Sequence, residues 1–149
     1  MQRKGLSLKA LSAATIFIAL SFAAARQALA FDQSNSAKAA TAAAEAWLQL
    51  VDDGKYNASW LEASTYFRNA VTKLEWKRQV SIWRTALGSV VSRKFRTAQY
   101  LTTLPGAPDG DYVLIQYDTT FTHKKSAVET ITPMLDADGK WRVSEYSIK

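Results

Sequence analysis

The spacing of apolar residues changes at Gly88, and this change constrains the fold more than any other feature of the sequence. Before Gly88, apolar residues recur every three or four positions, as they do in helices that bury one face. After it, apolar and polar residues alternate in segments rich in Val, Thr, Tyr and Ile, a pattern typical of strands. Helices followed by strands predict the α+β class, with the helices packed on one face of an antiparallel sheet.

Three helices are predicted before Gly88. The first covers residues 36–54, ends with Gly54 as its C-terminal cap, and turns one apolar stripe to the core: Ala40, Ala44, Trp47, Leu48 and Val51. The second covers residues 56–67. The third begins with a capping box at Thr72 and Glu75, ends at Gly88, and has this stripe: Trp76, Val80, Trp83 and Leu87.

Four strands are predicted after Gly88, at residues 90–103, 111–123, 127–136 and 140–148. The links between them, "PGAPDG", "HKK" and "DADGK", are short turn sequences, which indicates an antiparallel meander. The second strand alternates, and we expect this core face: Val113, Ile115, Tyr117, Thr119 and Phe121. Pro133 in the third strand lacks an N–H donor, so an edge position or a bulge is expected there.

The first 30 residues have the pattern of a secretory signal. Three basic residues and no acid precede the uncharged run "ALSAATIFIALSFAAA", and Ala28 and Ala30 have the spacing of a cleavage site. We therefore predict cleavage after Ala30, a single domain at residues 31–149, and a periplasmic or secreted protein that contacts membranes only through the transient signal. The alternative is an uncleaved anchor, although the apolar run is shorter than the roughly 20 residues needed to cross a bilayer.

Composition excludes several classes of site. The chain has no cysteine, which excludes disulfides and Cys-ligated metals. The formal charge is +6, but four of the 19 basic residues precede Phe31 whereas all 13 acidic residues follow it, so the mature chain carries +2. Nucleic-acid binding depends on clustered excess positive charge, and we expect none. The local basic residues are interpreted as solvated faces of a helix and a strand: Lys77, Arg78, Arg84, Arg93, Lys94 and Arg96.

Glu129 is the main candidate for a functional residue. Alternation places it on the same face of the third strand as Ile131, so its carboxylate needs a partner or a wet cavity. One hypothesis is an apolar ligand pocket formed with Arg84, Tyr117 and Trp83. Desolvation in such a pocket would raise the pKa of Glu129 and suit it to acid or base catalysis. The alternative is an ion pair between Glu129 and Arg84 that ties the third helix to the sheet.

No other chemistry is predicted from the residue types. His123, the lone histidine, lies in a turn beside Lys124 and Lys125 and is interpreted as solvated. The "DADG" sequence lacks the spacing of a calcium loop, and a hairpin turn explains Asp136 and Asp138. No metal and no cofactor are expected, because one histidine and no cysteine leave mostly carboxylates as ligands.

Five segments carry a resemblance to a known family: "LVDDGKYNASW", "LGSVVSRKFRTAQY", "LPGAPDGDYVLIQYDTTF", "AVETIT" and "LDADGKWRVSEYSIK". Together they resemble the bacterial exported family DUF4019, a domain of unknown function, and the resemblance implies no activity and no catalytic residues. The residues that match the family pattern include Trp60, Arg84, Gly88, Arg93, Tyr117, Phe121, Glu129, Trp141 and Tyr146. The order of elements is also similar to the cone-shaped nuclear-transport-factor-2-like and cystatin-like folds, which is a likeness of fold alone.

Three functions remain open. The favoured one is a small exported binding or accessory module, with a modest pocket for an unknown small apolar ligand or a face for an envelope protein. The second is an enzyme of the cone-fold type that uses Glu129 as acid or base. The third is an envelope structural protein that forms a homodimer through the solvent side of its sheet, where Tyr112 and Leu114 are expected.

Overall fold

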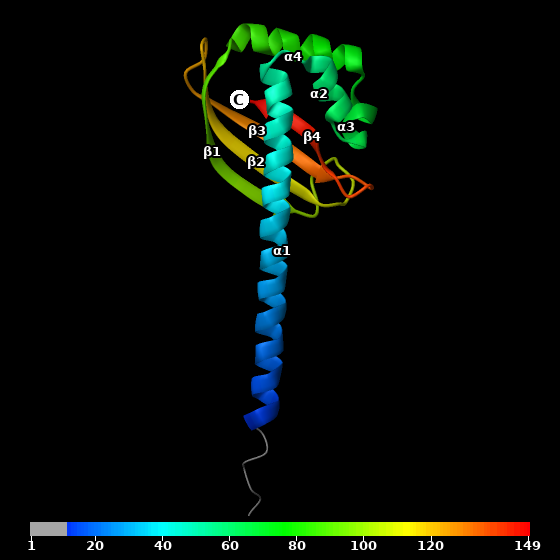
Figure 1. The fold of residues 1–149 in the computed structure, drawn as a ribbon, viewed down its shortest axis with the longest axis vertical. Helices are drawn as coiled ribbons and strands as arrows, with labels where there is room; N and C mark the ends of the chain where they lie inside the picture. Colours follow the sequence, from blue (N-terminus) through cyan, green and yellow to red (C-terminus); the bar gives the residue numbers. More distant parts are fainter. Residues whose placement is uncertain (1–11) are drawn as a thin grey trace, which may run out of the picture. The chain divides into compact units, whose positions relative to one another are not determined.

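The computed structural model describes the backbone of residues 12–149 and the side chains from residue 25 onward. Contacts divide the chain into two units, one ending at Asn35 and one comprising Ser36–Lys149, and each is described by itself. Helix α1 (Ser12–Asp52) belongs to both (Figure 1). Residues 1–11 of the expected signal lie outside the described residues. Within the described part of the chain, no helix has the length and apolar character needed to cross a membrane.

The C-terminal part of α1, residues 36–52, is the first helix of the Ser36–Lys149 unit. All five residues of its predicted stripe are buried. The helix begins before the predicted residue 36. The polar stretch "FDQSNS", at residues 31–36, is part of the helix. Side chains 25–35 of this extension are exposed.

Two short helices replace the second predicted helix. They are α2 (Tyr56–Glu62) and α3 (Thr65–Ala70). The break lies at Ser64, whose backbone is extended. Its N–H donates to the carbonyl of Val143 in the sheet at 2.9 Å, and its hydroxyl accepts from the N–H of Phe67 to cap α3. The hydrogen bond to the sheet and the new cap together explain why one helix becomes two.

Helix α4 (Lys73–Leu87) begins with the predicted capping box, in which both reciprocal hydrogen bonds are present. Its core face differs from the predicted stripe. Trp76 and Val80 are buried as expected, but Trp83 is 37% exposed and Arg84 is buried beside them. Arg84 turns inward because its guanidinium reaches an acidic partner at the end of α1, as described below.

The four predicted strands form one antiparallel sheet in the order β1-β2-β3-β4 (Figure 1). Their bounds, each within two residues of the prediction, are Val90–Leu101, Tyr112–Phe121, Ala127–Leu135 and Trp141–Ile148. β3 is an interior strand, and its register with β4 shifts at Pro133, so the proline occupies a bulge rather than an edge. The α+β class and the meander are confirmed, whereas the likeness to cone-shaped folds stays a prediction.

The core lies between the helices and one face of the sheet. All five residues of the predicted core face of β2 are buried. Aromatic rings from helices and sheet meet there: the ring centroid of Trp47 lies 5.6 Å from that of Trp76 and 5.4 Å from that of Tyr146. Phe67 packs edge-on against Trp76 at 5.1 Å. Each such pair contributes about 0.5–1.5 kcal/mol to stability beyond the effect of its burial. These contacts help to stabilise a domain that has no cysteine and therefore no disulfide.

The opposite face of β2 is less open than the homodimer hypothesis requires. Tyr112 is fully buried, and its hydroxyl donates to the carbonyl of Pro108 at 2.6 Å. Leu114 is partly buried. The loop between β1 and β2 therefore covers the aromatic residue that was expected to drive association through this face.

Gly88 joins α4 to β1 at a point where no side chain fits. Its φ is 77°, and a Cβ would lie 1.9 Å from Oγ1 of Thr122 in the hairpin between β2 and β3. We expect Gly88→Ala to lower the free energy of unfolding by roughly 2–4 kcal/mol, because backbone strain and steric overlap add. Urea denaturation measures this loss.

The control for this prediction is Gly139→Ala. Gly139 also has a left-handed φ, of 76°, but its added Cβ would meet no atom within 4 Å. Only the backbone strain remains, so a loss of about 1 kcal/mol is expected. Equal losses for the two variants would contradict the steric explanation for Gly88.

Candidate functional site

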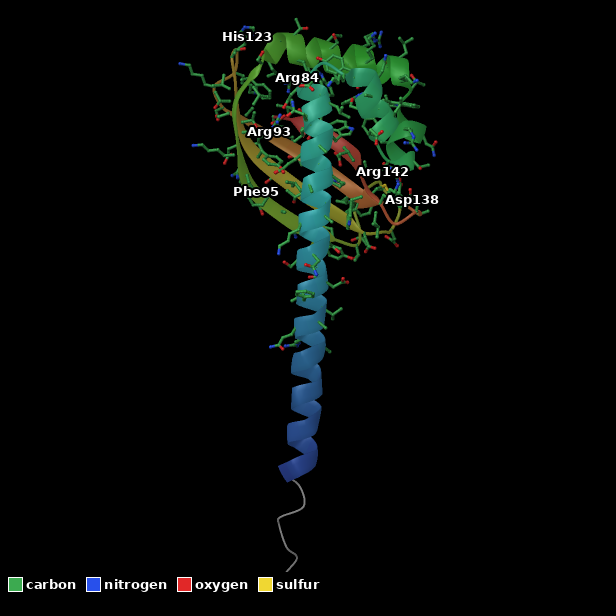
Figure 2. All side chains as sticks on the ribbon, viewed as in Figure 1. Arg84, Arg93, Phe95, His123, Asp138 and Arg142 are labelled. Atoms are coloured by element: carbon green, nitrogen blue, oxygen red, sulfur yellow. The ribbon has the colours of Figure 1, made fainter. Side chains whose placement is uncertain are left out.

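Six polar side chains converge between the helices and the sheet, and we name them the carboxylate cluster. They come from α1, α4 and all four strands: Asp52, Arg84, Arg93, Thr119, Glu129 and Tyr146. Figure 2 labels the two arginines, one on α4 and one on β1. Every element of the Ser36–Lys149 unit except the two short helices contributes one member.

Glu129 is fully buried, yet both oxygens of its carboxylate are well supplied with donors. Arg93 donates through Nε to Oε2 at 2.6 Å and through Nη2 to Oε1 at 3.1 Å. The hydroxyl of Thr119 donates to Oε2 and that of Tyr146 to Oε1, both at 2.6 Å. Register explains the arrangement, because Arg93 lies directly across from Thr119 in the pairing of β1 with β2.

The pKa of Glu129 follows from these contacts. Burial raises the pKa, but the hydrogen bonds and positive charge of Arg93, with the hydroxyls of Thr119 and Tyr146, lower it further than burial raises it. Glu129 is therefore ionised at neutral pH. Acid or base chemistry required a raised pKa and open space before the carboxylate, and protein donors occupy that space. The raised pKa that the catalytic hypothesis requires is therefore not found at Glu129.

Asp52 links the two arginines at the C-terminal end of α1. Arg93 donates through Nη1 to Oδ2 at 2.7 Å and through Nη2 to Oδ1 at 3.1 Å, and Arg84 donates through Nη2 to Oδ1 at 2.8 Å. Burial lowers the pKa of Arg93, but Asp52 and Glu129 together raise it above its ordinary value. The expected pair of Glu129 with Arg84 is thus replaced by a chain of alternating charges, Glu129–Arg93–Asp52–Arg84.

Arg84 is held partly by an aromatic ring. Its Nη1 is buried and has no hydrogen-bond partner among the described residues. The guanidinium carbon lies 5.2 Å from the centroid of Phe121, a cation–π contact that stabilises the charge where hydrogen bonding is incomplete. The interpretation of Arg84 and Arg93 as solvated charges is therefore wrong, because both are enclosed in ion pairs.

Tyr117 lies beside the carboxylate cluster rather than in it. It is directly across from Glu129 in the pairing of β2 with β3, but its hydroxyl donates to Glu45 of α1 at 3.4 Å. Burial, reinforced by the charge of Glu45, raises the pKa of Tyr117 to about 12. Its ring packs edge-on against Phe95 of β1, which is labelled in Figure 2.

Trp83, the fourth predicted ligand residue, lines a different site, which we name the Trp83 pocket. The pocket has a volume of about 340 Å³ and lies between α4, the β2–β3 hairpin and the end of β4. Its lining residues are Trp83, Ala86, Leu87, Lys124, Ser147 and Ile148. The structure therefore separates Trp83 from Glu129, Arg84 and Tyr117, which do not line this pocket.

Other hollows are more polar or less enclosed. A groove of about 520 Å³ between α1 and β4 contains Trp47 and Trp141 with charged residues around them. We name it the α1–β4 groove. A small hollow of about 260 Å³ lies beside Asp52 and Arg84, and its lining is mostly polar.

The remaining candidates have structural explanations. His123 is exposed, and its backbone N–H donates to the carbonyl of Leu87 at 3.0 Å. Arg142 donates to Asp136 at 3.0 Å and to both oxygens of Asp138 at 2.8 Å. The bonds to Asp138, which is labelled with Arg142 in Figure 2, lower the pKa of Asp138 to about 2. Among the residues that the structure describes, no three His, Cys, Asp or Glu side chains are grouped to hold a metal ion.

The partners of Glu129 in the structure, Arg93, Thr119 and Tyr146, differ from the Arg84 that was expected. Thr119 was predicted on the core face of β2, as Glu129 was on that of β3. A hydroxyl and a carboxylate that both face the core of one sheet could have indicated their hydrogen bond. Asp52 and Arg93 are 41 residues apart, and no local pattern indicates their contact. Arg93 becomes predictable only once the register of β1 against β2 is known.

We expect Glu129→Gln to lower the free energy of unfolding at pH 7 by roughly 3 kcal/mol, because it removes one partner of a buried ion pair. The folded pKa of Glu129 is lower than the ordinary value of 4.5, so its stabilisation is present above that pH and is lost as pH falls through the folded pKa. The variant should therefore lose less stability than the wild type on acidification. Urea denaturation from pH 7 to pH 3 measures both effects.

Asp138→Asn is the matched control, because it neutralises an exposed carboxylate that also pairs with an arginine. Exposed ion pairs are screened by water and salt, so the loss at pH 7 should be much smaller than for Glu129→Gln. If Asp138→Asn destabilised the protein as strongly as Glu129→Gln, the special role of the buried carboxylate would be refuted.

A comparison with protein families places these residues in context. Residues 43–146 match the family described as Protein of unknown function (DUF4019). The matched range includes the whole carboxylate cluster and all of the Trp83 pocket except Ser147 and Ile148. A comparison with curated proteins finds no match. Because the family match covers more than half of the chain, this protein belongs to the DUF4019 family.

Proposed function

We propose that the protein is an exported binding module that takes a small apolar ligand in the Trp83 pocket. The observation that carries the proposal is the composition of the pocket: four apolar residues form most of its lining, and only Lys124 and Ser147 are polar. Ligand sites are commonly apolar hollows with few polar groups, and volumes of about 300 Å³ and above are usual. Trp83, at 37% exposure, offers an aromatic surface for such a ligand to cover.

The walls of the pocket are held by backbone hydrogen bonds. The N–H of His123 donates to the carbonyl of Leu87 at 3.0 Å, which joins the β2–β3 hairpin to the end of α4. Val128 and Lys149 exchange two backbone hydrogen bonds at 2.9 and 3.0 Å, which hold the end of the chain beside β3. A pocket with fixed walls requires little ordering when a ligand binds, and this favours affinity.

The two polar residues indicate the chemistry of the ligand. Lys124 provides a positive charge and Ser147 a hydroxyl, and both can donate a hydrogen bond. We therefore propose an apolar or aromatic body that carries one acidic group. Binding is preferred to catalysis because Glu129, the carboxylate proposed for catalysis, lies outside this pocket and is already saturated with donors.

Ala86→Leu tests the pocket directly. Ala86 is an exposed helical residue that lines the pocket, so a larger side chain should occupy the ligand space without disturbing the core. The probe is anilinonaphthalene sulfonate, an aromatic anion whose fluorescence increases in apolar surroundings. We expect Ala86→Leu to weaken its binding by about tenfold or more, because it occupies the space that the aromatic rings would fill. Fluorescence titration measures the change.

Ala46→Leu is the matched control, because Ala46 is also an exposed helical alanine but lines the α1–β4 groove. It should bind the probe as the wild type does. The reverse result, with binding lost in Ala46→Leu and kept in Ala86→Leu, would refute the Trp83 pocket and favour the groove. Absence of probe binding by the wild type would also contradict the proposal.

Export with cleavage after Ala30 is part of the same proposal. The sequence features of the first 30 residues support it, and side chains 25–35 are exposed, so their loss leaves the buried residues of the domain in place. We expect the protein released from the periplasm of a bacterial host to have the denatured mass of residues 31–149. Ala28→Asp, which removes a small residue from the cleavage spacing, should retain the longer mass. A wild-type mass that includes residues 1–30 would refute cleavage.

A further inference from the structure

We infer that the outer face of α4 docks on the surface of an anionic phospholipid bilayer. Leu74 and Ile82 are 76% and 62% exposed, which is unusual for residues of this size. With Arg78 they occupy positions i, i+4 and i+8 and therefore follow one line along the helix. Trp76 and Val80 are buried, so this line lies on the side of α4 away from the core.

Positively charged residues lie beside and between the two exposed apolar residues, Leu74 and Ile82. Lys77 and Arg78 belong to α4, and Lys124 lies beside Trp83 at its C-terminal end. In the described part of the chain, none of the three forms a salt bridge. Glu75, the acidic residue of α4, is occupied by the capping box and accepts from the hydroxyl of Thr72 at 2.6 Å. The exposed side of α4 thus carries two cations that form no salt bridge with a described residue, Lys77 and Arg78, in a mature chain of charge +2.

The position of α4 makes the face accessible to a broad surface. Figure 1 shows α4 lying across one end of the sheet, with the β2–β3 hairpin at one end of the helix. Figure 2 labels His123 of this hairpin near the end of α4. Trp83 lies seven residues after the buried Trp76, and their ring centroids are 6.5 Å apart, so it faces the pocket rather than this outer side.

The charge and shape of this face favour a lipid surface as its occupant. Its apolar side chains, Leu74 and Ile82, protrude singly from a helix, and the exposed cations Lys77 and Arg78 accompany them, an arrangement that suits a broad surface. A bilayer is such a surface: apolar side chains enter the headgroup region while cations remain with lipid phosphates. Each lysine or arginine near an anionic surface adds attraction, and this attraction weakens in salt. The inference does not depend on the ligand proposed for the Trp83 pocket.

The test is sedimentation of the periplasmic protein with vesicles. Vesicles of equal parts phosphatidylglycerol and phosphatidylcholine should bind the wild type, whereas vesicles of phosphatidylcholine alone should not. Ile82→Ser should weaken binding about tenfold, because it removes an inserted apolar side chain. Arg78→Gln should weaken it about fivefold at low salt, because it removes one cation from the surface. Urea denaturation confirms that both variants are folded.

Two controls lie on β1. Val91 is 64% exposed and Lys94 is exposed, so Val91→Ser and Lys94→Gln likewise remove one apolar side chain and one cation, but at a different surface. Both should bind vesicles as the wild type does. Absence of binding to anionic vesicles, or equal weakening by the α4 and β1 variants, would overturn the inference.

Discussion

The pairing of Arg93 with both Glu129 and Asp52 is the interaction on which the rest of the domain depends. One guanidinium on β1 joins a carboxylate in the middle of the sheet to another at the end of α1. Removing these charges from water is costly, and only the complete set of partners offsets that cost. Arg84, which extends from α4 to Asp52, is held by the same set. The relative positions of helices and sheet are thus specified by charge as well as by packing.

This dependence separates structure from function in the molecule. A buried, perturbed carboxylate near tyrosines is a common sign of an active site, but such signs also mark structural ion pairs. Here the donors around Glu129 are all protein groups, and no concavity opens onto its carboxylate among the hollows described above. The surfaces suited to other molecules lie on and beside α4, where Trp83 and Ile82 are exposed. The carboxylate cluster holds α4 in position through Arg84, and the opposite side of α4 is exposed to solvent.

The alternation and period of the sequence predicted the class of fold, the four strands, and the burial of Glu129 on an apolar face. These are local properties, and they follow from the spacing of side chains along one element. The sequence did not predict the break at Ser64 or the exchange of Trp83 for Arg84 in the core of α4. The break depends on the hydrogen bond from Ser64 to Val143, and the inward turn of Arg84 depends on Asp52. Both partners are distant in the chain, so only the tertiary structure brings them together.

The hydrogen bond from Ser64 to Val143 has a consequence for behaviour at high concentration. β4 is an edge strand, and edge strands with free backbone groups can recruit strands from other molecules. The link between α2 and α3 occupies one of these backbone carbonyls, and α3 packs against β4. The other edge, β1, carries two register shifts and several cations, features that hinder a flat pairing. Both margins of the sheet therefore carry features that hinder the addition of a further strand.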